Sequence, residues 1–149
     1  MTAFVIDKTI EIDAPLSVVW SVITDMGRYP EWNPFQVECQ TSFRAGDPID
    51  MRVQLGKRVQ RQREYVVEYV PDKLFSYRMK PAPLGALHSF RSHEVEALGP
   101  ARTRYRSFFK IDGWAKGVVL GLMQEALETG FAGMTAGIQR RAVELHRRR

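Results

Sequence analysis

Alternation of apolar and polar residues is the first pattern along the chain. In FVIDKTIEI, residues 4–12, Phe4 and three isoleucines fall on one side of an extended backbone, and Lys8 interrupts the series. Side chains of a β-strand point alternately to its two faces, so this segment predicts a strand with one buried face. Pro15 follows the strand and suits the first turn of a helix.

The apolar spacing then changes to the period of a helix. In LSVVWSVITDM, residues 16–26, apolar side chains recur every three or four positions, which predicts about three turns of amphipathic helix. Gly27 ends this helix, and the aromatic residues Tyr29, Trp32 and Phe35 follow within a turn stiffened by two prolines. We expect these rings to close one end of the core, with Trp32 either filling space or forming a wall beside a ligand.

Six more strands are predicted after this turn. Alternation is clearest in IDMRVQL, residues 49–55, whereas residues 56–63 are mostly polar and predict a hairpin with exposed ends. Short turn signals separate the segments, and strands joined in this way are usually antiparallel neighbours. The expected strands are residues 35–42, 49–55, 64–70, 74–79, 87–98 and 101–111.

The end of the chain predicts one long helix. Residues 115–146 contain no proline, and their apolar side chains recur at helical spacing. Five glycines lie in this segment, each costing roughly 1 kcal/mol relative to alanine in a helix. Close approach of the helix backbone to the sheet would offset that cost, and so would room for a guest molecule.

Together these elements predict an α+β protein with one domain, residues 1–149, in the order β-α-(α)-β6-α. A curved antiparallel sheet of about seven strands would wrap around the long C-terminal helix, which is a helix-grip arrangement. A strongly curved sheet leaves space between itself and the helix, so we expect a cavity lined by alternate strand residues and one stripe of the helix.

Four segments resemble the SRPBCC, or START-like, superfamily, and they cover nearly the whole chain. Its opening is matched by the strand ending in Ala14-Pro15, the Val19-Trp20 pair and the turn YPEWNPF. The matching segments are IEIDAPLSVVWSVITDMGRYPEWNPF, VPDKLFSYRM, LHSFRSHEVEALGPARTRYRSFFKIDG and GFAGMTAGIQRRAVE.

The resemblance implies the helix-grip fold and a choice of functions. The superfamily includes plant allergens that carry steroids and phenolics, lipid-transfer domains, and aromatase/cyclases and dehydratases of polyketide synthesis. This chain is most similar to bacterial members described as polyketide cyclase/dehydratase-like. Some relatives carry an acidic residue near the position of Phe109, and the phenyl ring here weakens the case for an enzyme.

Composition and charge narrow the class of protein. The single cysteine, Cys39, excludes an internal disulfide, and the N-terminus carries no apolar leader, so we expect a cytoplasmic protein. The net charge of +5 comes partly from the terminal Arg147–Arg149, which we interpret as a solvated helix end. We therefore expect no nucleic acid partner, no stable membrane insertion, and a monomer or homodimer whose partner is a small hydrophobic molecule.

Strand alternation selects the residues that would line the cavity. Glutamates beside Tyr65 and Tyr69 should face water, which turns both tyrosines inward. In the strand at 87–98 we expect Phe90 inward, although the opposite alternation would make Arg91 and His93 the polar residues of the pocket. The predicted ligand-binding residues are Trp32, Met51, Val53, Tyr65, Tyr69, Phe90, Tyr105, Phe109, Met123, Leu127 and Phe131.

Candidates for catalysis are few. His88 and His93 are five residues apart, so they point to opposite faces of one strand. Neither a nucleophile motif nor a metal-ligand spacing occurs, and no cofactor is expected. Tyr65, Tyr69 and His88 remain as weak candidates for handling protons.

Three functions stay open at this point. The first is binding of a lipid, a polyketide-like molecule or another aromatic molecule in the cavity, without catalysis. The second is a cyclase or dehydratase acting on a polyketide-like substrate through the tyrosines or His88. The third is a protein-interaction module that uses a basic outer face of the sheet, formed by Arg52, Arg102, Arg104 and Arg106.

Overall fold

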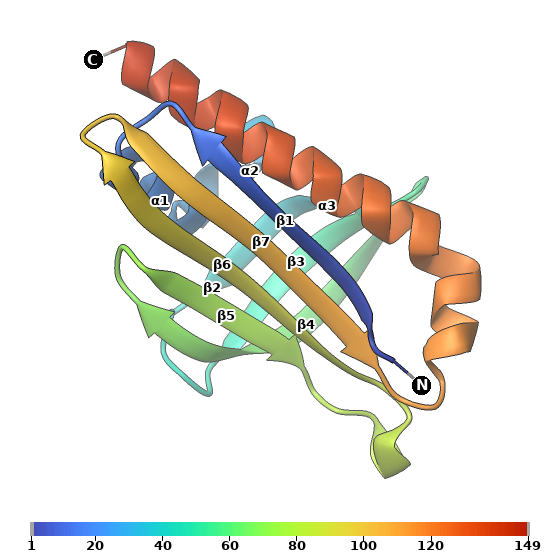
Figure 1. Ribbon diagram of the computed structural model, residues 1–149. Coiled ribbons are helices and arrows are strands. Elements are labelled where there is room, and N and C mark those ends of the chain that lie inside the picture. The colour runs from blue at the N-terminus through green and yellow to red at the C-terminus, as the bar shows by residue number, and fades with distance from the viewer. Residues whose placement is uncertain (1, 149) are drawn as a thin grey trace.

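One antiparallel sheet forms the body of the protein. A computed structural model describes residues 2–148 and has seven strands in the order β1-β7-β6-β5-β4-β3-β2 (Figure 1). Except for β1 with β7, every pair joins strands that follow one another in the sequence. The strands are β1 (Phe4–Ile12), β2 (Gln36–Thr41), β3 (Pro48–Leu55), β4 (Arg58–Val70), β5 (Leu74–Met79), β6 (His88–Gly99) and β7 (Arg102–Asp112).

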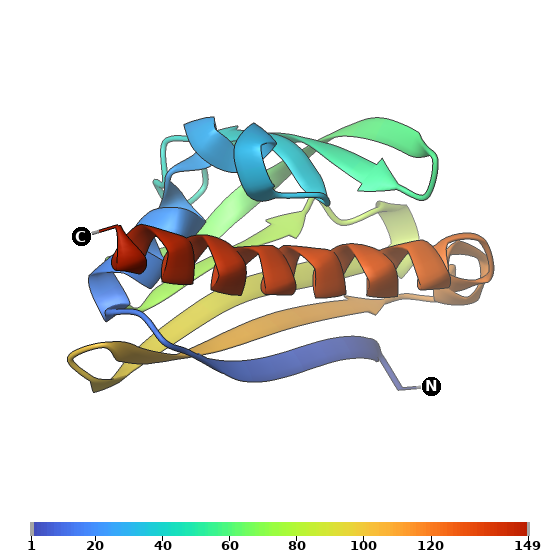
Figure 2. The ribbon, with the colours of Figure 1, turned by 90° about the horizontal axis from the view of Figure 1, so that it is seen from above.

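A single long helix lies in the hollow of this sheet. Figure 2 shows the two edges of the sheet on either side of α3, with the two short α-helices near the C-terminal end of α3. The β3–β4 hairpin and the start of α3 lie at the opposite end of the molecule. The helical segments are α1 (Leu16–Thr24), the 3₁₀ turn η1 (Met26–Arg28), α2 (Tyr29–Trp32), the 3₁₀ turn η2 (Pro83–Gly85) and α3 (Lys116–Arg147).

The predicted helix-grip fold is confirmed, with one difference in β4. That strand begins at Arg58 and runs for 13 residues, so most of the segment predicted as an exposed hairpin belongs to the sheet. Its polar residues suit a long strand because alternate ones face solvent, and the others face a cavity described below.

Only one half of the space between sheet and helix is filled by the core. Met134, Ile138 and Ala142 in the second half of α3 are fully buried against the sheet and α1. In the first half, Val118 and Leu122 remain 69% and 82% exposed. The helix is therefore anchored by its C-terminal half.

The aromatic turn after α1 closes the filled half. Asn33 stabilises the turn, since its side-chain Oδ1 accepts hydrogen bonds from the backbone N–H groups of Phe35 and Gln36, both at 3.0 Å. Tyr29 and Trp32 are buried and pack edge to face, with ring centroids 5.1 Å apart. Trp32 thus fills space in the core.

Two of the glycines in α3 allow this turn to approach the helix. A Cβ atom at Gly130 would lie 2.2 Å from Cδ1 of Phe35, and one at Gly137 would lie 2.9 Å from Cε3 of Trp32. Close approach is therefore the reason for these glycines, as predicted, but it is made to the aromatic turn. Gly121, by contrast, has no atom within 4 Å of its Cβ position.

This difference gives a test of the packing. Gly130→Ala should lower the free energy of unfolding by about 1–3 kcal/mol, because the methyl group collides with the Phe35 ring. Gly121→Ala should raise it by up to about 1 kcal/mol, because alanine favours the helix and meets nothing. Urea unfolding of both variants measures the two effects, and a stabilised Gly130→Ala protein would contradict the close packing.

Candidate functional site: a cavity under the first half of the long helix

A cavity of about 430 Å³ lies between the sheet and the first half of α3. Its walls come from β3 to β7, from the helix, and from Phe35 at the end of the aromatic turn. Most of the lining side chains are apolar. The apolar lining residues are Phe35, Met51, Val53, Leu55, Met79, Leu87, Phe109, Ile111, Val118, Val119, Leu122, Met123, Leu127 and Phe131.

The cavity opens between the β3–β4 hairpin and the start of α3. Leu55 on the hairpin and the exposed Val118 and Leu122 on the helix belong to its lining. Two more exposed apolar residues, Leu84 and Trp114, lie on the loops before β6 and α3, where the Trp114 indole N–H donates to the Leu84 carbonyl at 2.9 Å. The mouth of the cavity is therefore bordered by apolar side chains whose exposure to water is unfavourable.

Six predicted ligand-binding residues line this cavity, namely Met51, Val53, Phe109, Met123, Leu127 and Phe131. Phe131 is central among them, because its ring packs on Phe109 and Phe35 with centroid distances of 4.6 and 4.8 Å. The predicted inward face of β7 is confirmed by the burial of the alternate residues Tyr105, Ser107, Phe109 and Ile111.

Three other predicted residues lie outside the cavity, in the filled half, where Trp32 and Tyr105 are buried and Tyr69 is half-buried. Trp32 packs against Gly137, and Tyr69 packs against Phe43, with ring centroids 4.9 Å apart. Tyr105 is fully buried, and its hydroxyl lies 2.7 Å from Nδ1 of His93. These side chains hold the fold together at a distance from the cavity lining.

The predicted orientation of β6 is wrong. Phe90 lies on the outer face, where it packs against Phe108 with ring centroids 6.2 Å apart, and His88 is exposed. Arg91 and His93 point inward and are only 2% and 1% exposed. The prediction turned the largest apolar ring of this strand, Phe90, toward the core. In the structure Arg91 faces inward because a serine of β7 and an aromatic ring of α3 stabilise its guanidinium group.

The predicted inward orientation of Tyr65 is also wrong, because β4 contains a β-bulge. The register of β4 against β5 shifts between Val66 and Glu68, so one extra residue stands on β4. Before the bulge Glu64 and Val66 face inward and Tyr65 faces outward, whereas Tyr69 after the bulge faces inward. A single inserted residue thus reverses the alternation within one strand.

The polar groups of the cavity were not predicted as site residues. Gln36 donates from Nε2 to the hydroxyl of Tyr77 at 2.7 Å, and both side chains are buried. Glu64, Ser89 and Arg91 are further polar members of the lining. The bulge hid Glu64, and the chosen alternation of β6 hid Ser89 and Arg91.

Arg91 is held by one end of its guanidinium group. Its Nη1 donates to the Ser107 hydroxyl at 2.7 Å and to the Ser92 carbonyl at 3.1 Å. The Cζ atom lies 4.8 Å from the centroid of the Phe131 ring, which is a cation–π arrangement. The Nε–H group is buried and has no hydrogen-bond partner.

Burial shifts the pKa values of the ionisable groups around the cavity. It raises the pKa of Glu64 to about 7, and the nearby positive charge of Arg91 opposes that shift. Burial also raises the pKa of Tyr77 and holds the pKa of His93 well below its ordinary value, so both stay neutral near pH 7. Glu64 is therefore the cavity group that changes charge near neutrality.

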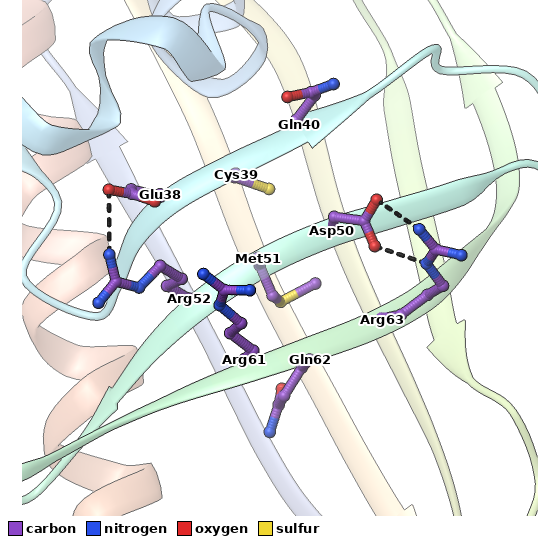
Figure 3. Close-up of a pocket in the computed structure, with 9 residues that line it drawn as sticks. All are labelled: Glu38, Cys39, Gln40, Asp50, Met51, Arg52, Arg61, Gln62 and Arg63. Carbon is purple, nitrogen blue, oxygen red and sulfur yellow. Dashed lines mark hydrogen bonds and ion pairs between the residues drawn. The ribbon is translucent and has the colours of Figure 1, made fainter.

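The outer face of the sheet carries paired charges. In a hollow of about 580 Å³ over β2 to β4, Arg63 pairs with Asp50 at 2.6 Å and Arg52 pairs with Glu38 at 3.4 Å (Figure 3). Across β1, β6 and β7, the arginines predicted as a basic face also have acidic partners. These pairs are Arg102–Glu11, Arg104–Glu96 and Arg106 with both Asp7 and Glu94. The face is a mosaic of both signs, which does not favour a partner of one charge.

Within residues 2–148, no cluster of three or more His, Cys, Asp or Glu side chains could hold a metal ion. Burial raises the pKa of the Cys39 thiol to about 12, which keeps it protonated. Across the same residues, no helix is both long and apolar enough to cross a membrane.

Comparisons with known proteins agree with this geometry. The family model described as polyketide cyclase / dehydrase and lipid transport matches residues 3–143. No curated protein sequence gives a significant match.

Solved structures share the fold at low sequence identity. The Zhui aromatase/cyclase from Streptomyces sp. R1128 is 17% identical, with a TM-score of 0.72 over 99% of this chain and 96% of that one. A START superfamily protein from Mycobacterium smegmatis is 17% identical, with a TM-score of 0.61 over 86% and 96% of the two chains. Norcoclaurine synthase from Thalictrum flavum is 16% identical, with a TM-score of 0.68 over 96% and 88%.

The raised pKa of Glu64 predicts how stability depends on pH. Between its ordinary pKa of 4.5 and about 7, the folded protein retains a proton that the unfolded chain has lost, so the free energy of unfolding falls as pH rises through this window. Glu64→Gln removes that penalty. It should stabilise the protein by about 1–3 kcal/mol above pH 7 and by much less near pH 4.

Urea unfolding across this pH range measures the difference between variant and parent. Glu68→Gln, at an exposed position of the same strand, is the matched control for the loss of a carboxylate. If both variants changed stability equally at every pH, Glu64 would not be the buried carboxyl described here.

Proposed function

This chain belongs to the polyketide cyclase / dehydrase and lipid-transport family, and from that membership and its cavity we propose that it binds a small hydrophobic molecule. The observation that carries the proposal is the cavity under α3, which is of ligand size and mostly apolar. Pockets for small molecules commonly have volumes of about 300–1,000 Å³ and combine apolar walls with a few polar groups. The deeper polar groups here are Gln36, Glu64, Tyr77, Ser89 and Arg91, and the lining also includes Gln60, Gln62 and Arg63 of β4.

The position of the cavity also supports a binding role. The filled half of the grip supplies the stability of the fold, so the other half can stay hollow. Met51 lines the cavity from the sheet and Met123 lines it from the helix. Methionine side chains adapt to apolar surfaces of different shape. Exposed apolar residues at the mouth give a hydrophobic molecule a path from solution.

A second candidate function is a cyclase or dehydratase, and one observation favours it. Glu64 has a pKa of about 7 and lies in the same cavity as Arg91, so it could take a proton from a substrate near neutral pH. This assignment replaces the tyrosines and the histidine proposed from sequence. If the protein is an enzyme, Glu64→Gln should retain ligand binding and abolish turnover of the substrate. If it is a binder, the parent protein shows no turnover and the variant still binds the ligand.

The cellular setting remains part of the proposal. The single free cysteine supports a location in a reducing compartment such as the cytoplasm.

Filling the cavity tests the proposed function. Met123→Trp places a large ring in the space under α3 and should weaken binding of hydrophobic molecules at least about tenfold, because the ligand loses its volume. Native mass spectrometry with a panel of lipids, alcohols and aromatic compounds measures retention. Val59→Trp, which adds the same ring at an exposed position of β4, is the matched control. Equal retention by the two variants would place the ligand elsewhere.

A further inference from the structure

Arg91 is a buried cation with few hydrogen-bond partners. It is 2% exposed, and its acceptors are the Ser107 hydroxyl, the carbonyls of Ser92 and Phe108, and the sulfur of Met134. None of these groups carries a negative charge. A charge buried without a counter-ion costs several kcal/mol relative to a paired one, so an arginine in this position calls for an anion.

The unsatisfied part of the guanidinium is one particular edge. All three oxygen acceptors contact Nη1. On the opposite edge, Nε–H has no partner and Nη2 has only the Met134 sulfur at 3.7 Å, which is a weak acceptor. The Tyr105 hydroxyl lies close enough for Arg91 to oppose the rise that burial causes in the pKa of that hydroxyl, but no hydrogen bond joins the two side chains. The edge formed by Nε and Nη2 therefore has donors without a hydrogen-bonded oxygen acceptor.

Two other arginines of this protein show what that edge binds. Arg63 donates from Nε and Nη2 to the two carboxylate oxygens of Asp50, at 2.6 and 3.0 Å. Arg106 binds Asp7 through the same two atoms, at 2.9 and 2.8 Å. This paired geometry is the preferred arrangement of arginine with a carboxylate. At Arg91 the same pair of donors lacks the carboxylate.

No residue of the cavity supplies the missing charge. Glu64 is the one acidic side chain in the described lining, and it makes no ion pair with Arg91. Its pKa of about 7 means that it is partly protonated near neutrality. Glu64 is thus near enough to feel the charge of Arg91 but makes no direct pair with it, which leaves the Nε–Nη2 edge available to a carboxylate of the ligand.

We propose that the cavity selects hydrophobic molecules that carry a carboxylate, and that this carboxylate pairs with the Nε–Nη2 edge of Arg91. The apolar body would extend along Met123 and Leu127 toward the mouth. This inference rests on the proposed binding function and names the chemical class of the ligand. Met134 is fully buried beside this edge, so its thioether must be displaced when the carboxylate binds.

Matched pairs of probes test the selection for a carboxylate. Decanoate is compared with decanol, and 2-naphthoate with 2-naphthylmethanol, by calorimetry or by displacement of a fluorescent apolar probe. Each acid should bind about 10- to 100-fold more tightly than its alcohol, as expected for a charge-assisted pair. The pair with the larger preference shows whether the natural acid is aliphatic or aromatic.

Variants of Arg91 assign the preference to its edge. Arg91→Met keeps the length and the apolar contacts without charge, and should abolish the preference for acids while leaving the alcohols at their original affinity. Arg91→Lys keeps the charge without the two-donor edge, and should retain only part of the preference. Arg104→Met, on the outer face, is the control and should change neither affinity.

Several outcomes would overturn the inference. Equal binding of acid and alcohol to the parent protein would do so, and so would equal loss of both with Arg91→Met, which would show a structural role. In either case the alcohols still bind the parent, so the proposed function survives. Failure of every probe to bind the parent protein would overturn the proposed function as well. Thermal unfolding identifies folded variants, and Arg91→Met should be at least as stable as the parent because a buried unpaired charge is gone.

Discussion

The contact between the aromatic turn and the glycines of α3 sets the geometry of the whole protein. Phe35 and Trp32 occupy positions where any side chain on Gly130 or Gly137 would collide with them. This contact fixes the height of the helix above the sheet at its middle and C-terminal parts. The first half of α3 instead spans the cavity, where Val118 and Leu122 stay exposed. The cavity is thus a consequence of where the helix is anchored.

The polar residues of the cavity gain their character from this arrangement. Arg91 projects from the middle of the sheet onto the face of Phe131, and its Nη1 end is satisfied by β6 and β7. Glu64 reaches the same space from β4, and burial raises its pKa into the neutral range. A cation and a titratable acid in an apolar cavity are costly to fold, which suggests that they serve a ligand. The paired charges on the outer face give no comparable signal.

Similarity to solved structures defines the fold of this protein but does not determine which ligand it binds or which reaction it catalyses. The neighbours include an aromatase/cyclase and a norcoclaurine synthase at 17% and 16% identity, so one architecture holds different reactions. The question of function therefore rests on Glu64, Arg91 and the space beside them. Substitution of these two residues separates the two proposals, a carrier of acidic hydrophobic molecules and an enzyme that moves a proton.

The sequence by itself determined the elements and their order. Alternation gave the seven strands, helical spacing gave α3, and the aromatic turn was expected to close one end of the core. Six cavity residues also followed from the pattern. Three came from the regular alternation in β3 and β7, which leaves one choice of inward face, and three came from helical spacing in α3. Tertiary structure alone decided the rest. Because of the bulge after Val66, Glu64 faces inward and Tyr65 outward while Tyr69 still faces inward, and no local pattern marks an inserted residue.

The orientation of β6 was likewise decided by distant partners. Arg91 can face inward because Ser107 and Phe131, which lie 16 and 40 positions further along the chain, bind and cover its guanidinium group. A sequence pattern weighs each side chain by its own polarity. It cannot include hydrogen bonds and aromatic faces that come from other strands and from the helix, and these contacts are the physical reason that the polar side of β6 lies in the core.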